Sequence, residues 1–250
     1  MIPQKCHLIW TTGVPMSWLQ TLTVESFRRY NPGWEMTIYL IKEVKGINTF
    51  VPDYKGDDYF GEISCRIVEV DLNEWDIRND KHGILASDQL RMKLLYKFGG
   101  VYSDFDMLWL RPLFTGDFET TVCYYKDHYN MSNIVSEPGV EFIKEIIEKQ
   151  NKVKPPYTHQ AFLTELFNRE YPNPDELVKR FPRIKLIPYK WFYPYSIYAL
   201  EELYKSNIDC TSESYGVHWF NGHKLSQEYL KDMAPCSMTS ILKREGYVAS

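Results

Sequence analysis

The first 41 residues alternate between two hydrophobic periods, and this alternation constrains the fold more than any other feature of the chain. Residues 6–10 form a short apolar run of strand length, and residues 35–41 alternate between two sides as strands do. Between them, residues 17–30 repeat apolar side chains near a helical period until Asn31-Pro32-Gly33 ends the segment. A strand, a helix and a strand in succession predict an α/β unit with a parallel sheet.

The same alternation continues further along the chain. A helix is expected over residues 85–98, whose apolar side chains share one face, and Gly99-Gly100 ends it. Further elements are expected as strands over residues 101–103, 121–125, 184–188 and 215–220, and as helices over 140–150 and 160–169. Residues 53–82, rich in Asp, Gly and Asn, give no clear pattern. No linker or repeat divides the chain, so we expect one domain over residues 1–250.

Composition narrows the classes of function. Hydrophobic residues make up 44% and charged residues 25% of the chain, which are proportions of a folded globular protein. The net charge of -4 argues against a nucleic-acid partner held by bulk positive charge. Aromatic residues reach 16%, and aromatic faces pack cores as well as stacking on bases and sugars. Composition leaves those uses of the aromatic side chains open.

The sequence contains no apolar run long enough for a membrane span and no signal-peptide core near its first residue. Its five cysteines are far apart, odd in number and without a C-x-x-C pair. This pattern argues against a structural zinc site and predicts reduced thiols in a cytosolic compartment.

Two aspartates follow the short strand at residues 101–103. Side chains two residues apart in an extended segment point the same way, so Asp104 and Asp106 share one side while Phe105 points to the other. Two adjacent carboxylates repel each other unless a cation lies between them, and a hard divalent ion such as Mg²⁺ or Mn²⁺ suits oxygen ligands. The carboxyl end of a strand in an open α/β sheet is also where ligands bind. A solvated acidic turn is the alternative interpretation.

Asp88 and Arg91 lie three residues apart on the preceding helix and therefore share a face. Gly99-Gly100 returns the chain directly from this helix to the two aspartates. An acid and an arginine placed there could bind a sugar hydroxyl and a phosphate. A simple ion pair between them is the alternative.

This block resembles a known enzyme family. Ala86-Ser87-Asp88-x-x-Arg91, then Gly99-Gly100-Val101-Tyr102-x-Asp104-x-Asp106 and Leu110-x-Pro112-Leu113, is similar to the DXD sugar-transferase region of glycosyltransferase family 32. That family comprises mannosyltransferases and bacterial capsular polysaccharide transferases, and the block is also similar to the glucosyltransferase domain of large clostridial toxins. The opening residues Ile2, Pro3, His7, Ile9 and Trp10 fit the same resemblance.

The resemblance implies a GT-A fold, which is a nucleotide-sugar-binding α/β domain with a mostly parallel central sheet flanked by helices. It implies a nucleotide-sugar donor, a divalent cation (Mn²⁺ or Mg²⁺) and retention of the anomeric configuration. We expect catalytic roles for Asp88, Arg91, Asp104 and Asp106. Nucleotide-sugar contacts are expected from Ile9, Trp10, Asp88, Arg91, Tyr102, Asp104 and Phe105, with Trp10 stacking on the base. Residues 1–115 would form the donor-binding part and residues 116–250 the acceptor side.

Later segments carry the resemblance less strongly. Phe192-Tyr193-Pro194 fits it, and Tyr215-Gly216-Val217-His218-Trp219 departs from the expected histidine doublet by having one histidine. His218 is a candidate metal ligand together with Asp104 and Asp106. Asn133, His159 and Trp219 are candidate contacts to the sugar or the acceptor, although Asn133 could equally be a turn or helix cap.

We therefore expect a metal-dependent, retaining transferase that moves a hexose from a UDP- or GDP-linked sugar to a glycan, a lipid-linked sugar or a protein. A microbial or virus-encoded enzyme of the cytoplasm fits this expectation, with room for peripheral membrane contact. Two alternatives remain. One is a phosphatase or phosphotransferase of the haloacid dehalogenase type, whose Asp-x-Asp stands near the first strand. The other is a carbohydrate-binding protein without catalysis.

Overall fold

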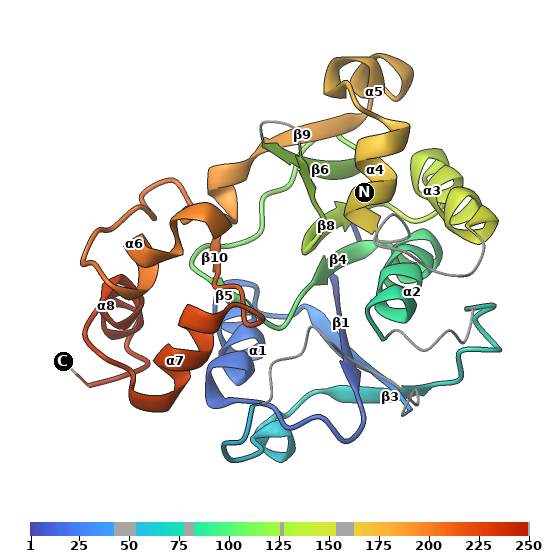
Figure 1. Ribbon diagram of the computed structural model, residues 1–250. Coiled ribbons are helices and arrows are strands. Elements are labelled where there is room, and N and C mark those ends of the chain that lie inside the picture. The colour runs from blue at the N-terminus through green and yellow to red at the C-terminus, as the bar shows by residue number, and fades with distance from the viewer. Residues whose placement is uncertain (43–53, 78–82, 126–127, 154–162, 250) are drawn as a thin grey trace.

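An eight-stranded, mostly parallel sheet forms the centre of the molecule (Figure 1). The computed structural model describes residues 1–42, 54–77, 83–125, 128–153 and 163–249. The strands run in the order β3-β2-β1-β4-β8-β6-β7, and β9 pairs with β6. Their bounds are β1 Lys5–Thr11, β2 Glu35–Ile41, β3 Arg66–Val70, β4 Gly100–Ser103, β6 Thr120–Tyr125, β7 His128–Asn130, β8 Asn133–Ser136 and β9 Ile184–Pro188. Only β7 and β8 run against the others in this sheet.

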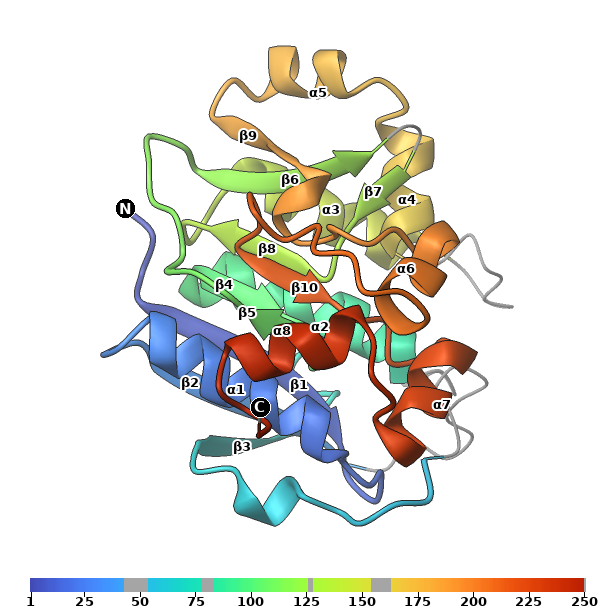
Figure 2. The ribbon, with the colours of Figure 1, turned by 90° about the vertical axis from the view of Figure 1, so that its left-hand side faces the viewer.

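Helices cover both faces of this sheet (Figures 1 and 2). One face carries α2 (Gly83–Phe98), α3 (Glu141–Lys152) and α4 (Leu163–Glu170), while α5 (Pro174–Arg180) lies beside β9. The other side carries α1 (Trp18–Tyr30) and the C-terminal helices α6 (Leu200–Tyr204), α7 (Lys224–Asp232) and α8 (Ser237–Arg244). A two-stranded antiparallel sheet of β5 (Met107–Trp109) and β10 (Gly216–His218) lies between α1 and these C-terminal helices.

The alternation of strand side chains divides the core into two layers. Val101 of β4 packs with Phe27 of α1 and with Leu8 of β1 in one buried cluster. Its neighbour Tyr102 packs with side chains of α2, α3 and α4 in a second cluster on the opposite face. Each strand residue therefore contributes to the layer that its position in the pleat selects, and the predicted α/β architecture with a mostly parallel sheet is confirmed.

Most of the expected elements are present. Strand β2 has the predicted bounds, α1 and α2 lie within two residues of theirs, and the last expected strand is the three-residue β10. The sequence did not predict β3, β5, β7, β8 or helices α5 to α8. Asn133 is the buried first residue of β8 and not a turn or helix cap.

Within the described residues, none of the helices has both the length and the apolar character needed to cross a membrane. All five cysteines are free thiols.

Candidate functional site

The turn that carries Asp104 and Asp106 joins β4 to β5 and is held from two sides. The backbone N–H of Asp104 donates to the carbonyl of Ser132 at 2.9 Å. From α1, the hydroxyl of Thr23 donates to the carbonyl of Phe105 at 2.7 Å. Phe105 itself is buried in the core. These contacts fix the backbone between the two aspartates, so their carboxylates are positioned by the core and do not move with a surface loop.

Two glycines bring the chain from α2 into β4 and so into this turn. Gly99 and Gly100 both have positive φ values, of 60° and 97°. A Cβ atom on Gly100 would also collide with the carbonyl oxygen of Lys5 on β1. Glycine tolerates both the left-handed backbone and the close approach, which is why the pair connects α2 to β4 so tightly.

Strand β10 brings His218 to the aspartates from more than 100 residues away. His218 lies opposite Met107 in the antiparallel pair, and the N–H of Trp219 donates to the carbonyl of Asp106 at 2.9 Å. The imidazole Nε2 then lies 3.0 Å from Oδ1 of Asp106. A Cβ on Gly216 would lie 3.0 Å from the backbone carbonyl oxygen of Leu108, so glycine lets β10 pair this closely with β5.

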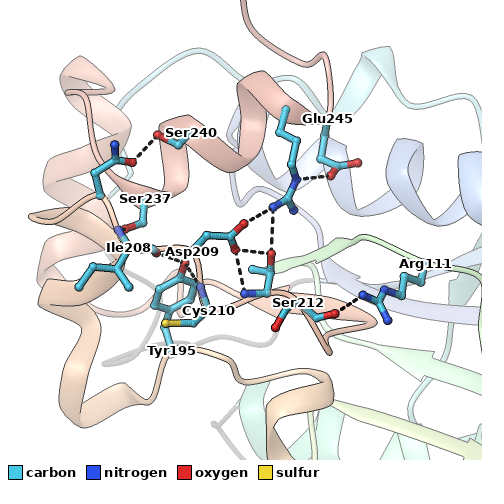
Figure 3. A network of polar contacts seen from close by, with 12 residues as sticks. Arg111, Tyr195, Ile208, Asp209, Cys210, Ser212, Ser237, Ser240 and Glu245 are labelled. Carbon is cyan, nitrogen blue, oxygen red and sulfur yellow. Dashed lines mark hydrogen bonds and ion pairs between the residues drawn. The ribbon is translucent and has the colours of Figure 1, made fainter.

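A polar network anchors the segment that leads into β10 (Figure 3). Asp209 accepts hydrogen bonds from the N–H and hydroxyl of Thr211 at 2.8 and 2.6 Å, and it pairs with Arg244 of α8 at 2.6 Å. Arg111, just after β5, donates to the carbonyl of Ser212. The segment between α6 and β10 is thus tied to α8 and to the chain that leaves β5, which holds β10 in place.

Asp104, Asp106 and His218 form a cluster that fits a divalent cation. Each residue offers one ligand atom, and these atoms all lie within 4.8 Å of one another. Two carboxylates and one imidazole suit Mn²⁺, which accepts oxygen ligands readily and nitrogen as well. The N–H of Asn221 donates to Oδ2 of Asp106 at 2.9 Å and orients that carboxylate.

The charged residues of this cluster change one another's pKa values. Burial by itself would raise the pKa of Asp106, but His218 and the Asn221 N–H hold that pKa below its ordinary value. Burial likewise opposes the charged form of His218, yet the two aspartates raise its pKa above the ordinary value. The pKa of Asp104 is raised, chiefly by burial, with Arg91 acting against that rise. Asp106 and His218 thus each favour the charged form of the other.

Arg91 on α2 is the buried cation at the centre of the site. Its Nη2 lies 3.1 Å from Oδ1 of Asp88 and 3.6 Å from Oδ1 of Asp104, and Nη1 donates to the carbonyl of Met131 at 2.9 Å. The guanidinium also lies 4.4 Å from the ring centre of Tyr102. Its Nε is buried and has no hydrogen-bond partner within the described part of the chain. The ion pair with Asp88, which was the alternative interpretation from the sequence, exists, and Arg91 links it to the Asp104 carboxylate.

Asp88 also has a structural contact that the sequence did not predict. Its Oδ2 accepts a hydrogen bond of 2.9 Å from the backbone N–H of Leu163, the first residue of α4. Burial raises the pKa of Asp88, while Arg91 and the Leu163 N–H act in the opposite direction. A carboxylate at a helix start satisfies a backbone donor and favours the helix dipole, so Asp88 joins α2 to α4.

Two cavities meet at Asp104 and Arg91. The smaller, of about 320 Å³, is lined by Ile9, Trp10, Thr11, Val14, Gln20, Ile84, Ser87, Arg91, Tyr102, Asp104, Phe105, Asp106, Asn221 and Gly222. The larger, of about 410 Å³, includes Asp88, Arg91, Asp104, Ser132, Tyr193, His218 and Phe220 among its lining residues. Asp104 and Arg91 belong to both linings, so one ligand could extend past them from one cavity into the other.

Most of the residues expected from the sequence lie around these cavities. Ile9, Trp10, Tyr102, Phe105 and Asp106 line the smaller cavity, and Asp88 and His218 line the larger. Trp10 packs edge-on against Phe105 with ring centres 5.1 Å apart, and its indole N–H donates to the carbonyl of Val14 at 3.1 Å. The indole is therefore held in place at the cavity wall.

Two of the weaker candidates, Asn133 and Trp219, are buried outside the described linings of the two cavities. Asn133 is 1% exposed, and its side-chain nitrogen and oxygen have no partner among the described residues. Trp219 is fully buried in the cluster formed with the C-terminal helices. Neither residue is among the described residues that line the two cavities. His159 lies outside the described residues.

Several site residues were not predicted. Asn221 and Gly222 come two and three residues after Trp219, and their position close to the single histidine was the available signal. Tyr193 stands in the Phe192-Tyr193-Pro194 segment, and its hydroxyl contacts the Ser132 hydroxyl beside the cluster. Tyr125, Tyr189 and Tyr198 carry no sequence motif at all.

Comparison with known proteins finds a family whose matched region includes the two aspartates of the site. The family described as a glycosyltransferase sugar-binding region containing a DXD motif matches residues 2–131, which is more than half of the chain. Subversion of eukaryotic traffic protein A of Legionella pneumophila subsp. pneumophila is 31% identical over 119 residues. That match covers 44% of this chain and 18% of the relative, so the chain spans less than a fifth of the relative's length.

Solved structures agree on the fold. The PaToxG glycosyltransferase matches with a TM-score of 0.52 at 16% identity, over 72% of this chain and 74% of that one. The ligand-free glycosyltransferase domain of the YGT toxin matches with a TM-score of 0.53 at 12% identity, over 83% of each chain. These likenesses confirm the expected GT-A fold. The family match decides against the phosphatase and the non-catalytic alternatives. The chain belongs to the family whose sugar-binding region contains the DXD motif, and it is a glycosyltransferase.

Proposed function

We propose that this glycosyltransferase moves a hexose from a nucleoside diphosphate sugar to a hydroxyl acceptor with the help of a divalent cation. The observation that carries this proposal is the meeting of two cavities at Asp104 and Arg91, directly beside the Asp104, Asp106 and His218 cluster. A nucleotide would lie in the smaller cavity, with its base against Trp10. The sugar would lie past Asp104, at the entrance to the larger cavity.

Asp104, Asp106 and His218 would hold Mn²⁺ or Mg²⁺, and their mixed oxygen and nitrogen ligands favour Mn²⁺. When bound, such a cation stabilises the negative charge that develops on a diphosphate leaving group. Asn221 fixes the orientation of Asp106 through its N–H, and β10 fixes His218. The ligand set is therefore assembled before any substrate arrives, which reduces the reorganisation that the reaction needs.

Arg91 would provide a second, permanent positive charge. Its guanidinium stays protonated, because the neighbouring Tyr102, Asp104 and Asp88 raise its pKa above the ordinary value although burial acts against this. Placed between the two cavities, it would stabilise charge on the departing phosphate. Asp88 holds the guanidinium at 3.1 Å and would also contact a sugar hydroxyl at the cavity floor.

We further propose retention of the anomeric configuration by front-face substitution. A double displacement needs a carboxylate nucleophile at the anomeric carbon. Two of the carboxylates that line the larger cavity, Asp88 and Asp104, are both engaged with Arg91. The departing phosphate would then take the proton of the acceptor hydroxyl on the same face. NMR of the product from a donor of known anomeric form tests this step, and an inverted product would contradict it.

We also propose that residues 1–115 act mainly on the donor and residues 116–250 on the acceptor. The smaller cavity takes all but two of its lining residues, Asn221 and Gly222, from the first part. The larger cavity takes most of its lining from the second part, with Asp88, Arg91 and Asp104 as its floor. The two parts would thus share one domain and one reaction centre.

Hydrolysis of UDP- and GDP-linked hexoses, each measured with Mn²⁺, with Mg²⁺ and with EDTA, tests the proposed function. Water carries a hydroxyl group and can replace the acceptor, so donor hydrolysis reports cleavage of the same bond. The proposal predicts release of the nucleoside diphosphate from at least one donor, only when a divalent cation is present. Equal release with EDTA would contradict the cation requirement, and no release from any donor would contradict the proposed reaction.

A further inference from the structure

The larger cavity has a wall of tyrosine rings beyond its charged floor. Tyr125 and Tyr189 lie with ring centres 3.8 Å apart and planes inclined by 35°. Tyr198 follows on a 3₁₀ turn (Ile197–Ala199), and 78% of its surface is exposed. The Ser196 hydroxyl accepts a hydrogen bond from the Tyr198 N–H at 3.2 Å and so holds this turn at its start. These three tyrosines, here called the tyrosine wall, all line the cavity.

The charged residues around this cavity argue against an anionic acceptor. Arg91 is the single lysine or arginine among the described residues of the lining, and Asp88 and Asp104 already pair with it. Beyond the Asp104, Asp106 and His218 cluster, a phosphorylated or carboxylated acceptor would therefore meet no lysine or arginine among these residues that could pair with it. The charge pattern favours a neutral acceptor.

The remaining lining suits a molecule with many hydroxyl groups. Asn130, Ser132, Thr164 and Ser196 place amide and hydroxyl groups around the rings. The volume of about 410 Å³ lies in the range of small-molecule sites rather than of a groove for a folded protein surface. Aromatic rings pack against the apolar faces of sugars, while the surrounding polar groups bind the hydroxyls.

We propose that the acceptor is a neutral saccharide whose pyranose ring packs against the tyrosine wall while its nucleophilic hydroxyl points to the floor at Asp104. This inference rests on the proposed function, since it assigns the acceptor of the same reaction. The oxygen of that hydroxyl forms a bond to the anomeric carbon as the bond from that carbon to the diphosphate oxygen breaks. The hydroxyl proton leaves with the nucleoside diphosphate, so the step is balanced.

The test compares two activities of the same protein, with Mn²⁺ present. One is transfer from the active nucleotide sugar to lactose, maltose, cellobiose and neutral p-nitrophenyl hexosides, and the other is donor hydrolysis by water. Because Tyr198 is largely exposed, Tyr198→Ala should fold normally. We expect it to lower the ratio of transfer to hydrolysis at least tenfold through a higher KM for the saccharide. Tyr198→Phe keeps the ring and should restore the ratio to within about twofold of the parent protein.

Ile208→Ala is the matched control, because Ile208 is also exposed, at 51%, and does not line the cavity. It should leave both rates unchanged. Three results would overturn the inference: an unchanged ratio in Tyr198→Ala, transfer to a glucuronic acid disaccharide as efficient as to lactose, or transfer to a peptide containing Ser, Thr and Tyr but to none of the neutral saccharides. Donor hydrolysis in these cases would leave the proposed function standing, whereas absence of donor hydrolysis would overturn both.

Discussion

At the scale of single residues, Asp106 joins the DXD turn to the C-terminal part of the chain. Its carboxylate contacts His218 at 3.0 Å and the Asn221 N–H at 2.9 Å, and its carbonyl accepts from Trp219. We predict that Asp106→Asn lowers cation-dependent donor hydrolysis about 10²–10³-fold, because the substitution removes one charged ligand while keeping the side-chain shape. Circular dichroism should show an intact fold. The exposed Asp117→Asn serves as control and should retain full activity.

Arg91 gives a prediction about stability. It lies between Asp88 and Asp104 with 9% of its side chain exposed. Arg91→Met leaves the buried carboxylate of Asp88 and the half-buried carboxylate of Asp104 without their cation. Removing the partner of a buried charge typically destabilises a protein by about 3–5 kcal/mol. Arg66 pairs with Glu35 on the surface, so Arg66→Met should change the free energy of unfolding by less than about 1 kcal/mol. Urea unfolding of both variants measures the difference, and equal effects would contradict a buried role for Arg91.

Sequence spacing could predict Asp104, Asp106, Asp88 and Arg91, because each pair lies within one local element. It could not predict contacts between distant residues. Asn221 reaches Asp106 across 115 positions, and the two meet only because β10 pairs with β5. The tyrosine wall likewise gathers side chains from β6 and from two 3₁₀ turns that follow β9. Aromatic residues are too common in this chain for their spacing to single out those three.

At the scale of elements, the entry into β4 depends on Gly100. This residue has a φ of 97°, and a Cβ there would strike the carbonyl of Lys5 on β1. Gly100→Ala should therefore destabilise the fold by several kcal/mol, roughly 2–4, through strain and a forced separation of β1 from β4. Gly13→Ala is the control for positive φ alone, since its added Cβ would meet nothing within 4 Å. Thermal unfolding of both variants tests the claim, and equal shifts would contradict the close approach.

The centre of β1 gives a prediction about pH. His7 is buried between β2 and β4 and contacts the carbonyl of Gly99 through Nε2 at 2.7 Å. Burial lowers its pKa from 6.5 to about 4. Between these values the unfolded chain binds the proton and the folded chain does not, so His7 favours unfolding increasingly as pH falls from 6.5 to about 4. The difference between the two pKa values predicts that the free energy of unfolding decreases by about 3 kcal/mol as pH falls from above 6.5 to below about 4.

Urea unfolding at several pH values measures this dependence. His7→Gln keeps a hydrogen-bond donor toward Gly99 but does not titrate in this range. The stability difference between the parent protein and His7→Gln should therefore shrink as pH falls from 6.5 to 4. A constant difference would show that His7 keeps its ordinary pKa in the folded protein.

The predicted elements were those with a strong local period, such as β2 and α2. Strand β3 was not predicted, because its residues are largely exposed and show no apolar alternation. Strand β8 was not predicted either, since Asn133 at its start is typical of turns. The C-terminal helices are short and are stabilised by packing on α1 and β5 rather than by a long amphipathic pattern. Tertiary contacts, not propensity, fix these elements.

At the scale of the whole molecule, a chain of net charge -4 forms a site suited to a diphosphate. The site contains the positive charge of buried Arg91, and its two aspartates and one histidine fit a divalent cation. Both positive charges would offset the negative charge of a diphosphate. Without the cation, the two carboxylates would repel a diphosphate, whereas with it the local charge becomes favourable. The proposed function therefore predicts that nucleotide binding depends on the metal.

The most direct test of this account is the thermal shift of the full chain with UDP and with GDP, each measured with Mn²⁺ and with EDTA. We predict that at least one nucleoside diphosphate raises Tm by about 5 °C or more at saturating concentration, because ligand at 100 times Kd stabilises a fold by about 2.7 kcal/mol. The shift should vanish with EDTA and in Asp106→Asn. An equal shift with EDTA, or no shift with either nucleotide, would contradict the central claim that Asp104, Asp106 and His218 hold a cation for nucleotide-sugar binding.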